Sequence, residues 1–274
     1  MSLRFTKMHG AGNDFVILDR IAGAPVPDAA LARRLADRRF GVGCDQIMLV
    51  EPARAAGEAF SYRILNADGS AAGQCGNGAR CVARYLRARH GLADGAVLGS
   101  PGGMVDVRFL ADGDIELSLG VPCFDPVAIP FLAGARQSRY PLELDGASLD
   151  VAVLSMGNPH AVLLVDDVAA ADVAGLGSRI ERHMRFPDRA NVGFVQLVDR
   201  RHLRLRVWER GVGETLACGS GACAAMVALR IVDAIDDAVA IELPGGCLRV
   251  RWAGEGEAVF LTGPAVFVFD GELT

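Results

Sequence analysis

The sequence predicts an α+β protein of two pseudo-symmetric domains, each a curled, mostly antiparallel and barrel-like β-sheet around a central helix, with the active site in the cleft between them. Three observations favour this class. One order of motifs occurs twice, one helical segment is apolar on every side, and the helices are too few to cover a parallel sheet. The length of 274 residues fits one large or two modest domains.

The duplication appears as a set of landmarks repeated at a nearly constant separation. The pattern Cys-Gly-x-Gly-Ala begins at Cys75 and again at Cys218, 143 residues later. We infer two copies of one unit of about 120 residues. Four further pairs are separated by 143 to 145 residues: Asn13 with Asn158, Asp28 with Asp172, Gln46 with Asn191, and Asn66 with Glu209.

Each copy predicts the same succession of elements. A short apolar strand comes first, followed by an amphipathic helix with an aspartate N-cap, further strands, a glycine-rich entry into a second helix, and closing strands with alternating apolar residues. Gly41 is expected to end the first of these helices. The ranges are 15–18 and 161–165 for the early strands, 28–40 and 172–183 for the first helices, 78–90 and 221–232 for the second helices, and 105–109, 115–119 and 248–252 for closing strands.

The second helix of the second copy is the element that most constrains the fold. Residues 222–229 are apolar around nearly the whole circumference, which is typical of a helix buried on all sides. A sheet curled around it would provide that burial. Prolines at 122, 126, 130 and 141 interrupt the pattern between the copies, so the expected domains are 1–120 and 121–263.

Composition excludes several classes of protein. The net charge of −5 disfavours a nucleic-acid binder. No apolar run reaches the roughly 18 residues of a membrane span, and the first residues lack a secretory pattern, so we expect a cytoplasmic protein. Its seven cysteines are then expected to be thiols. Lys7 is the single lysine and has no phosphate-binding loop near it, which disfavours pyridoxal phosphate chemistry.

Cys75 and Cys218 are the candidate reactive groups. Each stands where a glycine-rich turn enters a helix, and the unpaired amides there favour a thiolate and can bind a carboxylate. The other five cysteines are interpreted as buried and inert. A zinc site is the alternative, but the spacings 75 to 81 and 218 to 223 do not match the usual zinc pattern, so no metal is expected.

Two equivalent thiols favour one reaction in particular. If the copies pack about a pseudo-two-fold axis, Cys75 and Cys218 meet across a cleft. One thiolate can then remove a proton from a stereogenic carbon while the opposite thiol returns a proton to the other face. This inverts the carbon with no cofactor, provided that oriented amides stabilise the carbanion and water is excluded.

Eight motifs along the chain are specific when taken together. They are Lys7 to Phe15, Gly43 to Gln46, Asn66 to Ser70, Cys75 to Cys81, Gly157 to His160, Asn191-Val192, Glu209 to Thr215 and Ala217 to Ala222. On these motifs the chain resembles the diaminopimelate epimerase family nearly end to end. In the family, threonine often replaces Ser220, and acidic residues often replace Ala71 and Gly73.

The resemblance implies interconversion of LL- and meso-diaminopimelate, in lysine and peptidoglycan precursor biosynthesis, with Cys218 accepting and Cys75 donating the proton in the LL-to-meso direction. It also implies a C-terminal strand, about 264–274, that returns to the first domain, a small amino-acid substrate, and a homodimer. His160 and Glu209 are expected to support the thiols and the ammonium group. The substrate-binding residues implied are Asn13, Gln46, Asn66, Gly76, Asn77, Asn158, Asn191, Glu209, Arg210, Gly219 and Ser220.

The residue types suit a substrate with two charged ends. Arg210 offers a guanidinium fork for a distal carboxylate, and Glu209 with the asparagine carbonyls offers acceptors for an ammonium group. Two alternatives stay open: a proline or hydroxyproline racemase of similar fold, and a thiol redox or non-catalytic binding protein. Proline lacks the second charged end that Arg210 would bind. A redox or binding role predicts that replacing either cysteine with alanine leaves function intact.

Overall fold

The computed structural model describes residues 3–274, which form two compact units. The first unit contains the chain as far as Ser118 together with Thr262–Thr274, and the second contains Leu119–Leu261. Among the described residues, no helix is both long enough and apolar enough to cross a membrane. The α+β class is confirmed: in each unit a mixed sheet curls around one helix without closing into a barrel.

The first unit is a curled sheet that packs around its second helix. Its elements are β1 (Leu3–Gly10), β2 (Asn13–Asp19), α1 (Ala29–Ala36), β3 (Gln46–Pro52), β4 (Phe60–Asn66), β5 (Ala71–Ala72), α2 (Gly76–His90), β6 (Val97–Ser100), β7 (Gly103–Phe109), β8 (Ile115–Ser118) and β18 (Val266–Leu273). Strands β2 and β3 are parallel, as are β4 and β6, whereas β1–β2, β3–β4, β4–β5, β6–β7 and β7–β8 are antiparallel. Helix α2 contacts β1, β2, β3 and β8.

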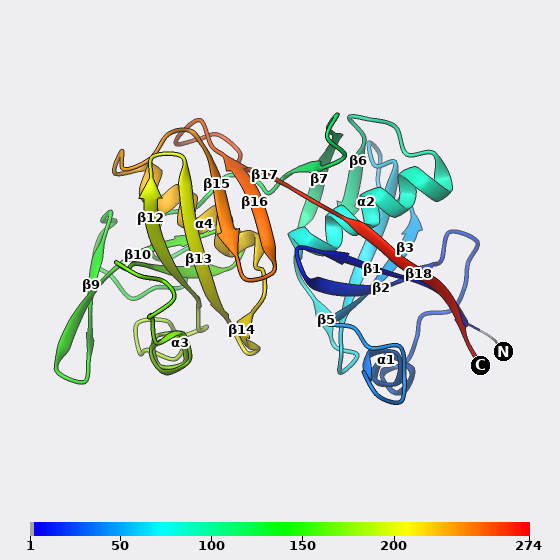
Figure 1. Cartoon of the computed structure of the whole chain (residues 1–274), viewed down its shortest axis with the longest axis horizontal. Helices are drawn as coiled ribbons and strands as arrows, with labels where there is room; N and C mark the ends of the chain where they lie inside the picture. Colours follow the sequence, from blue (N-terminus) through cyan, green and yellow to red (C-terminus); the bar gives the residue numbers. More distant parts are fainter. Residues whose placement is uncertain (1–2) are drawn as a thin grey trace. The chain divides into compact units, whose positions relative to one another are not determined.

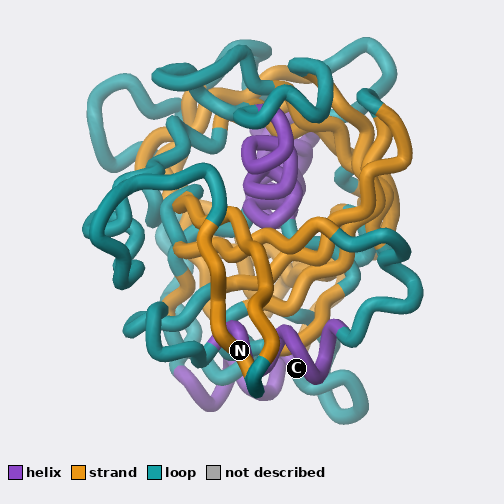
Figure 2. Tube along the Cα trace, turned by 90° about the vertical axis from the view of Figure 1, so that its left-hand side faces the viewer, coloured by secondary structure: helices purple, strands orange, loops and turns teal. Residues whose placement is uncertain are grey.

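The second unit repeats this plan. Its elements are β9 (Tyr140–Leu144), β10 (Ala147–Ser155), β11 (Pro159–Leu164), α3 (Val173–Glu181), β12 (Asn191–Asp199), β13 (His202–Glu209), β14 (Gly213–Thr215), α4 (Gly219–Arg230), β15 (Ala238–Leu243), β16 (Gly246–Arg251) and β17 (Phe260–Gly263), of which β17 crosses the boundary of the unit. The sheet surrounds α4, which contacts β10, β11, β12, β13 and β16. Figure 2 shows a helix enclosed by strands in this way.

The strand pairings establish that the two units share one topology. In the second unit β11–β12 and β13–β15 are parallel, and β10–β11, β12–β13, β13–β14 and β15–β16 are antiparallel. These match β2–β3, β4–β6, β1–β2, β3–β4, β4–β5 and β6–β7 of the first unit one for one. The repeat predicted from the motifs is therefore a repeat of structure.

The helices begin close to their predicted N-termini. The Asp28 carboxylate accepts a hydrogen bond from Leu31 N at 2.8 Å, and the Asp172 carboxylate accepts one from Gly175 N at 2.9 Å. Helix α1 ends at Ala36 rather than Phe40, because the Asp37 carboxylate captures the amides of residues 39 and 40. The second helix of each unit starts two residues earlier than expected, directly after its cysteine.

Helix α4 is as buried as its composition predicts. Residues 222–229 are at most 2% exposed. An apolar helix of this kind is stabilised by packing on all sides rather than by an amphipathic face. Helix α2 is less apolar but is also buried through most of its first ten residues, including the fully buried Arg80.

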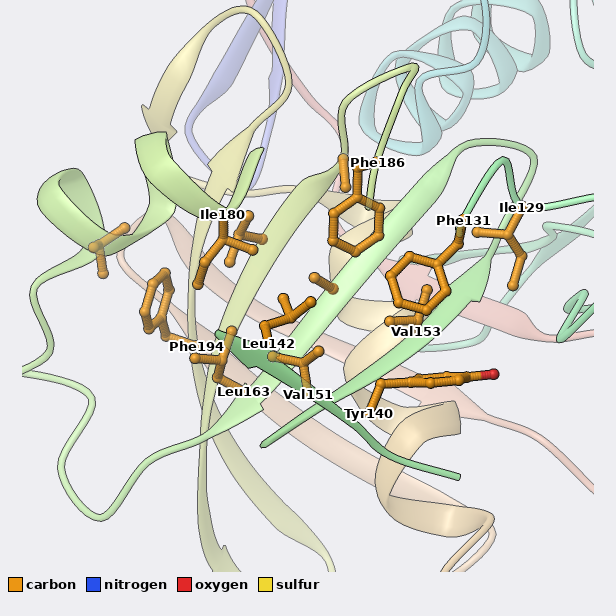
Figure 3. Packing of buried hydrophobic residues seen from close by; sticks show 14 of the residues in the cluster. Ile129, Phe131, Tyr140, Leu142, Val151, Val153, Leu163, Ile180, Phe186 and Phe194 are labelled. Carbon is orange, nitrogen blue, oxygen red and sulfur yellow. The ribbon is translucent and has the colours of Figure 1, made fainter. Parts of the chain in front are cut away.

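The proline-rich segment expected at the domain boundary belongs to the second unit. Ile129, Phe131, Tyr140 and Leu142 are at most 3% exposed. Their side chains join the apolar cluster between α3 and the sheet shown in Figure 3. The prolines interrupt the regular alternation of strands and helices, because proline lacks a backbone N–H. The apolar residues of this irregular segment anchor it to the core.

The chain returns to the first unit through its last strand. Strand β18 pairs antiparallel with β1 from Leu3 to His9, and Figure 1 shows it in red beside β1. Thr6 Oγ1 donates to Asp270 at 2.6 Å, and the Arg89 guanidinium contacts the same carboxylate at 2.6 Å. Residues from opposite ends of the sequence thus build one sheet.

Candidate functional site

Cys75 is the N-cap of α2. Its backbone is extended, its half-buried side chain accepts a hydrogen bond from Gly78 N at 3.4 Å, and its carbonyl accepts the first intrahelical bond, from Ala79 N at 2.9 Å. The amides of Gly76 and Asn77 precede that first bond. The thiol therefore lies at the positive end of a helix dipole, beside amides suited to an anion.

A buried arginine fixes the first turn of α2. Arg80 is fully buried, and its Nη2 donates to Asn77 Oδ1 at 2.8 Å. Its Nε donates to Pro264 O at 3.3 Å, on the segment that leads into β18. Because a buried guanidinium needs acceptors in fixed places, Arg80 determines how the Asn77 side chain is oriented.

Asn13 reaches the thiol from the start of β2. The Cys75 Sγ donates to Asn13 Oδ1 at 3.8 Å, and Asn77 Nδ2 donates to the same oxygen at 3.4 Å. On its other side, Asn13 Nδ2 donates to Asp45 Oδ2 at 2.6 Å. Asp45 therefore orients the Asn13 amide so that its oxygen, rather than its NH₂ group, points toward the Cys75 thiol.

Asp45 itself belongs to an ion network. Arg38 contacts Asp45 at 2.7 Å and Asp14 at 2.8 Å, and Lys7 contacts Asp14 at 2.6 Å. These cations hold the pKa of Asp14 below its ordinary value although burial acts to raise it. Arg38, two residues beyond the end of α1, thus orders the loop that carries Asp45.

Gln46 and Asn66 form the remaining polar pair of the first unit. They are register partners across β3 and β4, and Gln46 Nε2 donates to Asn66 Oδ1 at 3.1 Å. Asn66 Nδ2 in turn donates to Ser70 Oγ at 3.0 Å. The structure thus brings together two groups of predicted residues in this unit, the Cys75–Asn77–Asn13 group and the Gln46–Asn66 pair.

Cys218 occupies the equivalent N-cap of α4. It is 5% exposed, and no hydrogen bond caps the helix through its side chain. Its Sγ lies 3.6 Å from Ser220 Oγ. Burial and the carboxylate of Glu209 raise the pKa of the Cys218 thiol well above its ordinary value. The helix terminus alone predicts a thiolate, but desolvation outweighs it here and the resting group is a thiol.

His160 is a buried neutral imidazole in the same unit. Its Nε2 donates to Asn158 Oδ1 at 3.0 Å, and its Nδ1 has no hydrogen-bond partner among the described residues. Burial, with a smaller contribution from Arg210, lowers its pKa to about 3. At neutral pH the ring therefore presents a lone pair rather than a charge.

Glu209, Arg210 and Asn191 meet where β13 ends. Asn191 Oδ1 accepts from Arg210 N at 3.0 Å, and Asn191 Nδ2 donates to Pro159 O at 3.1 Å. Thr215 Oγ1 donates to Glu209 Oε1 at 2.5 Å. The Arg210 side chain is exposed, and its Nη1 donates to Asp188 O at 3.1 Å. The Arg210 guanidinium is thus held at the surface, and the Glu209 carboxylate of the preceding residue is held by Thr215.

Three residues that order these groups were not predicted as site residues. Asp45 and Arg80 fix Asn13 and Asn77, and Glu181 contacts the Arg210 loop from α3. Asp45 lies in the motif Gly43 to Gln46 and Arg80 in the motif Cys75 to Cys81, so the sequence offered a signal for both residues. The sequence offered no such signal for Glu181, because a glutamate at the end of a helix normally indicates a solvated position.

The other cysteines differ in exposure. All seven cysteines carry thiols. Cys44, Cys81 and Cys223 are buried as expected, and burial raises the pKa of Cys44 to about 11. Cys123 is half-buried and Cys247 is exposed, so the interpretation of these two as buried residues is wrong. Cys247 lies on a solvent-facing position of β16. Among the described residues no group of three or more His, Cys, Asp or Glu side chains is placed to hold a metal ion.

Comparison with known proteins identifies close relatives. The family model described as diaminopimelate epimerase matches residues 5–124 and 152–268. A diaminopimelate epimerase of Xanthomonas euvesicatoria pv. vesicatoria is 56% identical, covering 98% of this chain and 96% of its own. One from Alkalilimnicola ehrlichii is 50% identical, covering 100% and 99%.

Solved structures share the fold at much lower identity. A hydroxyproline epimerase of Agrobacterium vitis, solved with trans-4-hydroxy-L-proline, aligns with a TM-score of 0.72 at 16% identity, covering 99% of this chain and 92% of its own. A phenazine biosynthesis protein of the PhzF family from Bacillus anthracis aligns with a TM-score of 0.71 at 16% identity, covering 100% and 99%. At these identities the likeness concerns the fold alone.

Proposed function

The chain belongs to the diaminopimelate epimerase family, and from this premise we propose that it interconverts LL- and meso-diaminopimelate by moving protons between two cysteines and one α-carbon. It is an isomerase of lysine biosynthesis that also supplies a peptidoglycan precursor. The observation that carries the mechanism is the repeated position of the two thiols. Cys75 and Cys218 are the N-caps of equivalent helices in two units of one topology.

The proton balance needs no cofactor. In the LL-to-meso direction the Cys218 thiolate takes the α-proton and becomes a thiol, and the Cys75 thiol gives its proton to the opposite face of the carbanion and becomes a thiolate. The reverse reaction exchanges the two roles. The mechanism requires both sulfurs to reach one carbon from opposite sides.

The helix N-termini supply the electrostatic part of catalysis. Gly76 with Asn77 and Gly219 with Ser220 begin their helices, where amides precede the first intrahelical bond. We assign these amides to the reacting carboxylate, whose negative charge grows when the α-proton leaves. Burial and the Glu209 carboxylate favour the thiol at Cys218 in the resting enzyme. The Cys218 proton therefore passes to the adjacent Glu209 carboxylate before the thiolate accepts the α-proton of the substrate.

The distal amino-acid end is assigned to the polar groups around these helices. Arg210 binds the distal carboxylate, and Glu209 with the amide oxygens binds the ammonium group. A site that pairs both charges rejects substrates lacking them by large factors. His160 orients Asn158 through its Nε2–H. The further residues of this set are Asn13, Gln46, Asn66, Asn158 and Asn191.

The test is an incubation of reduced enzyme with LL-diaminopimelate in D₂O without added cofactor. Meso product carrying solvent deuterium at the α-carbon supports the proposal. Absence of both product and exchange, in a folded and reduced sample, would contradict it. A parallel incubation with proline and hydroxyproline distinguishes the substrate class, because those substrates lack the second charged end.

Single replacements of Cys75 and Cys218 by alanine test the roles of the thiols. Each variant is expected to lose epimerisation, with kcat reduced by at least about 10³-fold since one proton donor or acceptor is missing. Retained activity in either variant would indicate a redox or binding role instead.

Two further assignments accompany this function. We place the enzyme in the cytoplasm, a reducing compartment in which its thiols stay reduced, and fractionation of cells tests the placement. We propose a homodimer, which sedimentation of the purified protein tests.

A further inference from the structure

We propose that Glu181 is a positioning residue that fixes the Arg210 loop and thereby sets the affinity for the distal carboxylate of the substrate. The inference rests on the proposed function and extends it to a residue outside the motifs. Glu181 touches neither thiol. It acts through a hydrogen bond to the Gly211 amide, directly after Arg210, while the Trp208 indole holds the other carboxylate oxygen.

The geometry is a buried carboxylate that holds two donors. Glu181 is the last residue of α3 and is 1% exposed. Its Oε2 accepts from Trp208 Nε1 at 2.7 Å, and its Oε1 accepts from Gly211 N at 2.9 Å. These donors flank Glu209 and Arg210 in the sequence. The Gly211 bond holds the loop backbone directly after Arg210, and the Trp208 bond holds the carboxylate itself.

The same residue also anchors the segment before Asn191. The Glu181 carbonyl accepts from Ala190 N at 3.2 Å, and Asn191 accepts from Arg210 N. Glu181 thus connects directly to Gly211 and, through Ala190 and Asn191, to Arg210. Two independent links from one helix end converge on the loop that carries the guanidinium.

The packing of α3 makes this support rigid. A Cβ atom added at Gly177 would lie 2.7 Å from Trp208 Cβ, closer than side chains can approach. Glycine at this position therefore lets α3 lie directly against β13. The Trp208 indole is consequently held where its N–H meets Glu181.

An ion pair does not account for burying this carboxylate. Arg189 Nη1 is 3.7 Å away on a side chain that is 54% exposed, which is a weak contact. A buried carboxylate is costly unless hydrogen bonds satisfy it. Its short contacts are the two donors that flank the Glu209–Arg210 pair, so its position is best explained by the loop that it holds.

Glu181→Gln is the direct test. A glutamine keeps the volume but has one oxygen, so it can accept from Trp208 or Gly211 and turns its NH₂ group toward the other donor. We expect the KM for LL-diaminopimelate to rise roughly tenfold, as for loss of one charge-assisted hydrogen bond, with kcat within about twofold of wild type. Inhibition by lysine, which lacks the distal carboxylate, is expected to be unchanged.

Trp208→Phe provides the matched control and a rescue. It removes only the indole N–H, leaves the Glu181–Gly211 bond, and is expected to keep KM near the wild-type value. In the double variant Glu181→Gln/Trp208→Phe, the glutamine oxygen is free to accept from Gly211 and its NH₂ group no longer faces a donor. The KM is therefore expected to return most of the way to wild type, even where thermal stability does not.

An unchanged KM in Glu181→Gln, or a raised KM that Trp208→Phe does not restore, would overturn the proposal. Amide hydrogen exchange at Gly211 provides a readout that needs no activity: it should accelerate in Glu181→Gln and slow again in the double variant. If wild-type enzyme does not act on diaminopimelate, the proposed function fails, and the exchange result still decides whether Glu181 holds the loop.

Discussion

Cys218 shows how burial and a helix terminus compete at a single residue. The helix dipole favours the thiolate by roughly 1 kcal/mol, whereas removal from water disfavours it more strongly. Burial is the larger effect, and Glu209 adds to it by favouring the protonated sulfur. In the resting site Cys218 is therefore protonated, although it is the residue assigned to accept the α-proton of the substrate.

Replacing Glu209 with glutamine tests this balance. Because the carboxylate raises the pKa of the Cys218 thiol, Glu209→Gln is expected to lower it. The measurement is the pH dependence of iodoacetamide alkylation at Cys218, followed by peptide mass, with alkylation of Cys247 as the internal reference. The same variant is expected to lose roughly 10²-fold in kcat, since an oriented acid–base partner is removed. An unchanged alkylation profile would show that Glu209 does not act on the sulfur.

His160 gives a stability prediction with a defined sign. Its pKa is about 3 in the folded protein, against 6.5 for an ordinary histidine. Between these values the unfolded chain binds a proton that the native chain does not, so the contribution of His160 is intact above pH 6.5 and is lost progressively as pH falls toward 3.

His160→Gln removes that titration. The free energy of unfolding, measured by urea denaturation at pH 7 and at pH 4.5, is expected to fall less on acidification in the variant than in wild type. Asp14 and other carboxylates with lowered pKa values lose stability mainly at lower pH in both proteins. An equal loss in the two proteins would mean that His160 is already protonated in the native state.

At this scale the sequence predicted the polar residues that contact one another near the thiols and His160 better than the residues that hold them in place. Asn13, Asn77 and Asn158 were identified because they recur or lie in motifs, and the structure shows each in contact with another predicted group. Glu181 was missed because its partners, Trp208 and Gly211, come from a strand end about 30 residues away. Only tertiary structure brings them together.

The Cys-Gly-x-Gly-Ala element has a packing requirement as well as a chemical one. At Gly221 an added Cβ would lie 3.0 Å from Val207 and 3.3 Å from Cys218 Sγ. At the equivalent Gly78 it would lie 2.8 Å from Met48. The third residue after each cysteine must be small, because the helix entry lies directly against the sheet.

Gly221→Ala is expected to cost about 1–3 kcal/mol of stability through overpacking, and to reduce kcat because the new methyl group crowds the sulfur. Thermal melting and steady-state kinetics measure both effects. Gly134→Ala, where an added Cβ meets nothing within 4 Å, is the control and should change neither. Wild-type behaviour of Gly221→Ala would show that the sheet can yield at Val207.

Helix ends were the least predictable feature of the elements. The apolar spacing of α1 continues to Phe40, but Phe40 is 86% exposed and the helix stops at Ala36. A local competitor, the Asp37 side chain, ends the helix by accepting two amides. The spacing of apolar residues predicts which face of the helix is buried. Where the helix ends is determined by hydrogen bonds from a single capping side chain.

For the molecule as a whole, the duplication predicted most of the fold. Repeated landmarks implied two units, and the structure repeats six strand pairings one for one. The route of the chain between units was less apparent, since the irregular segment around Pro130 carries no period although it is anchored by Ile129 and Phe131. Burial of an irregular segment depends on a surface that other elements create.

The two units differ in continuity along the chain, and this difference predicts how each one folds alone. The second unit is one continuous segment, 119–261, with its own apolar cluster. The first needs 262–274, because β18 supplies the partner of β1 and the Asp270 contacts to Thr6 and Arg89. We expect a fragment of residues 119–261 to melt cooperatively by circular dichroism, as a domain of this size should.

A fragment of residues 1–118 should then lack a cooperative melt until residues 262–274 are restored, either fused ahead of residue 1 by a flexible linker or added as a peptide. Pairing β1 along its length covers an otherwise open sheet edge, which is a recognised source of aggregation. The permuted fusion is therefore expected to be both more stable and less aggregated than the bare fragment. Cooperative folding of residues 1–118 alone would show that β18 is an accessory strand, and failure of 119–261 to fold would show that the second unit depends on the first.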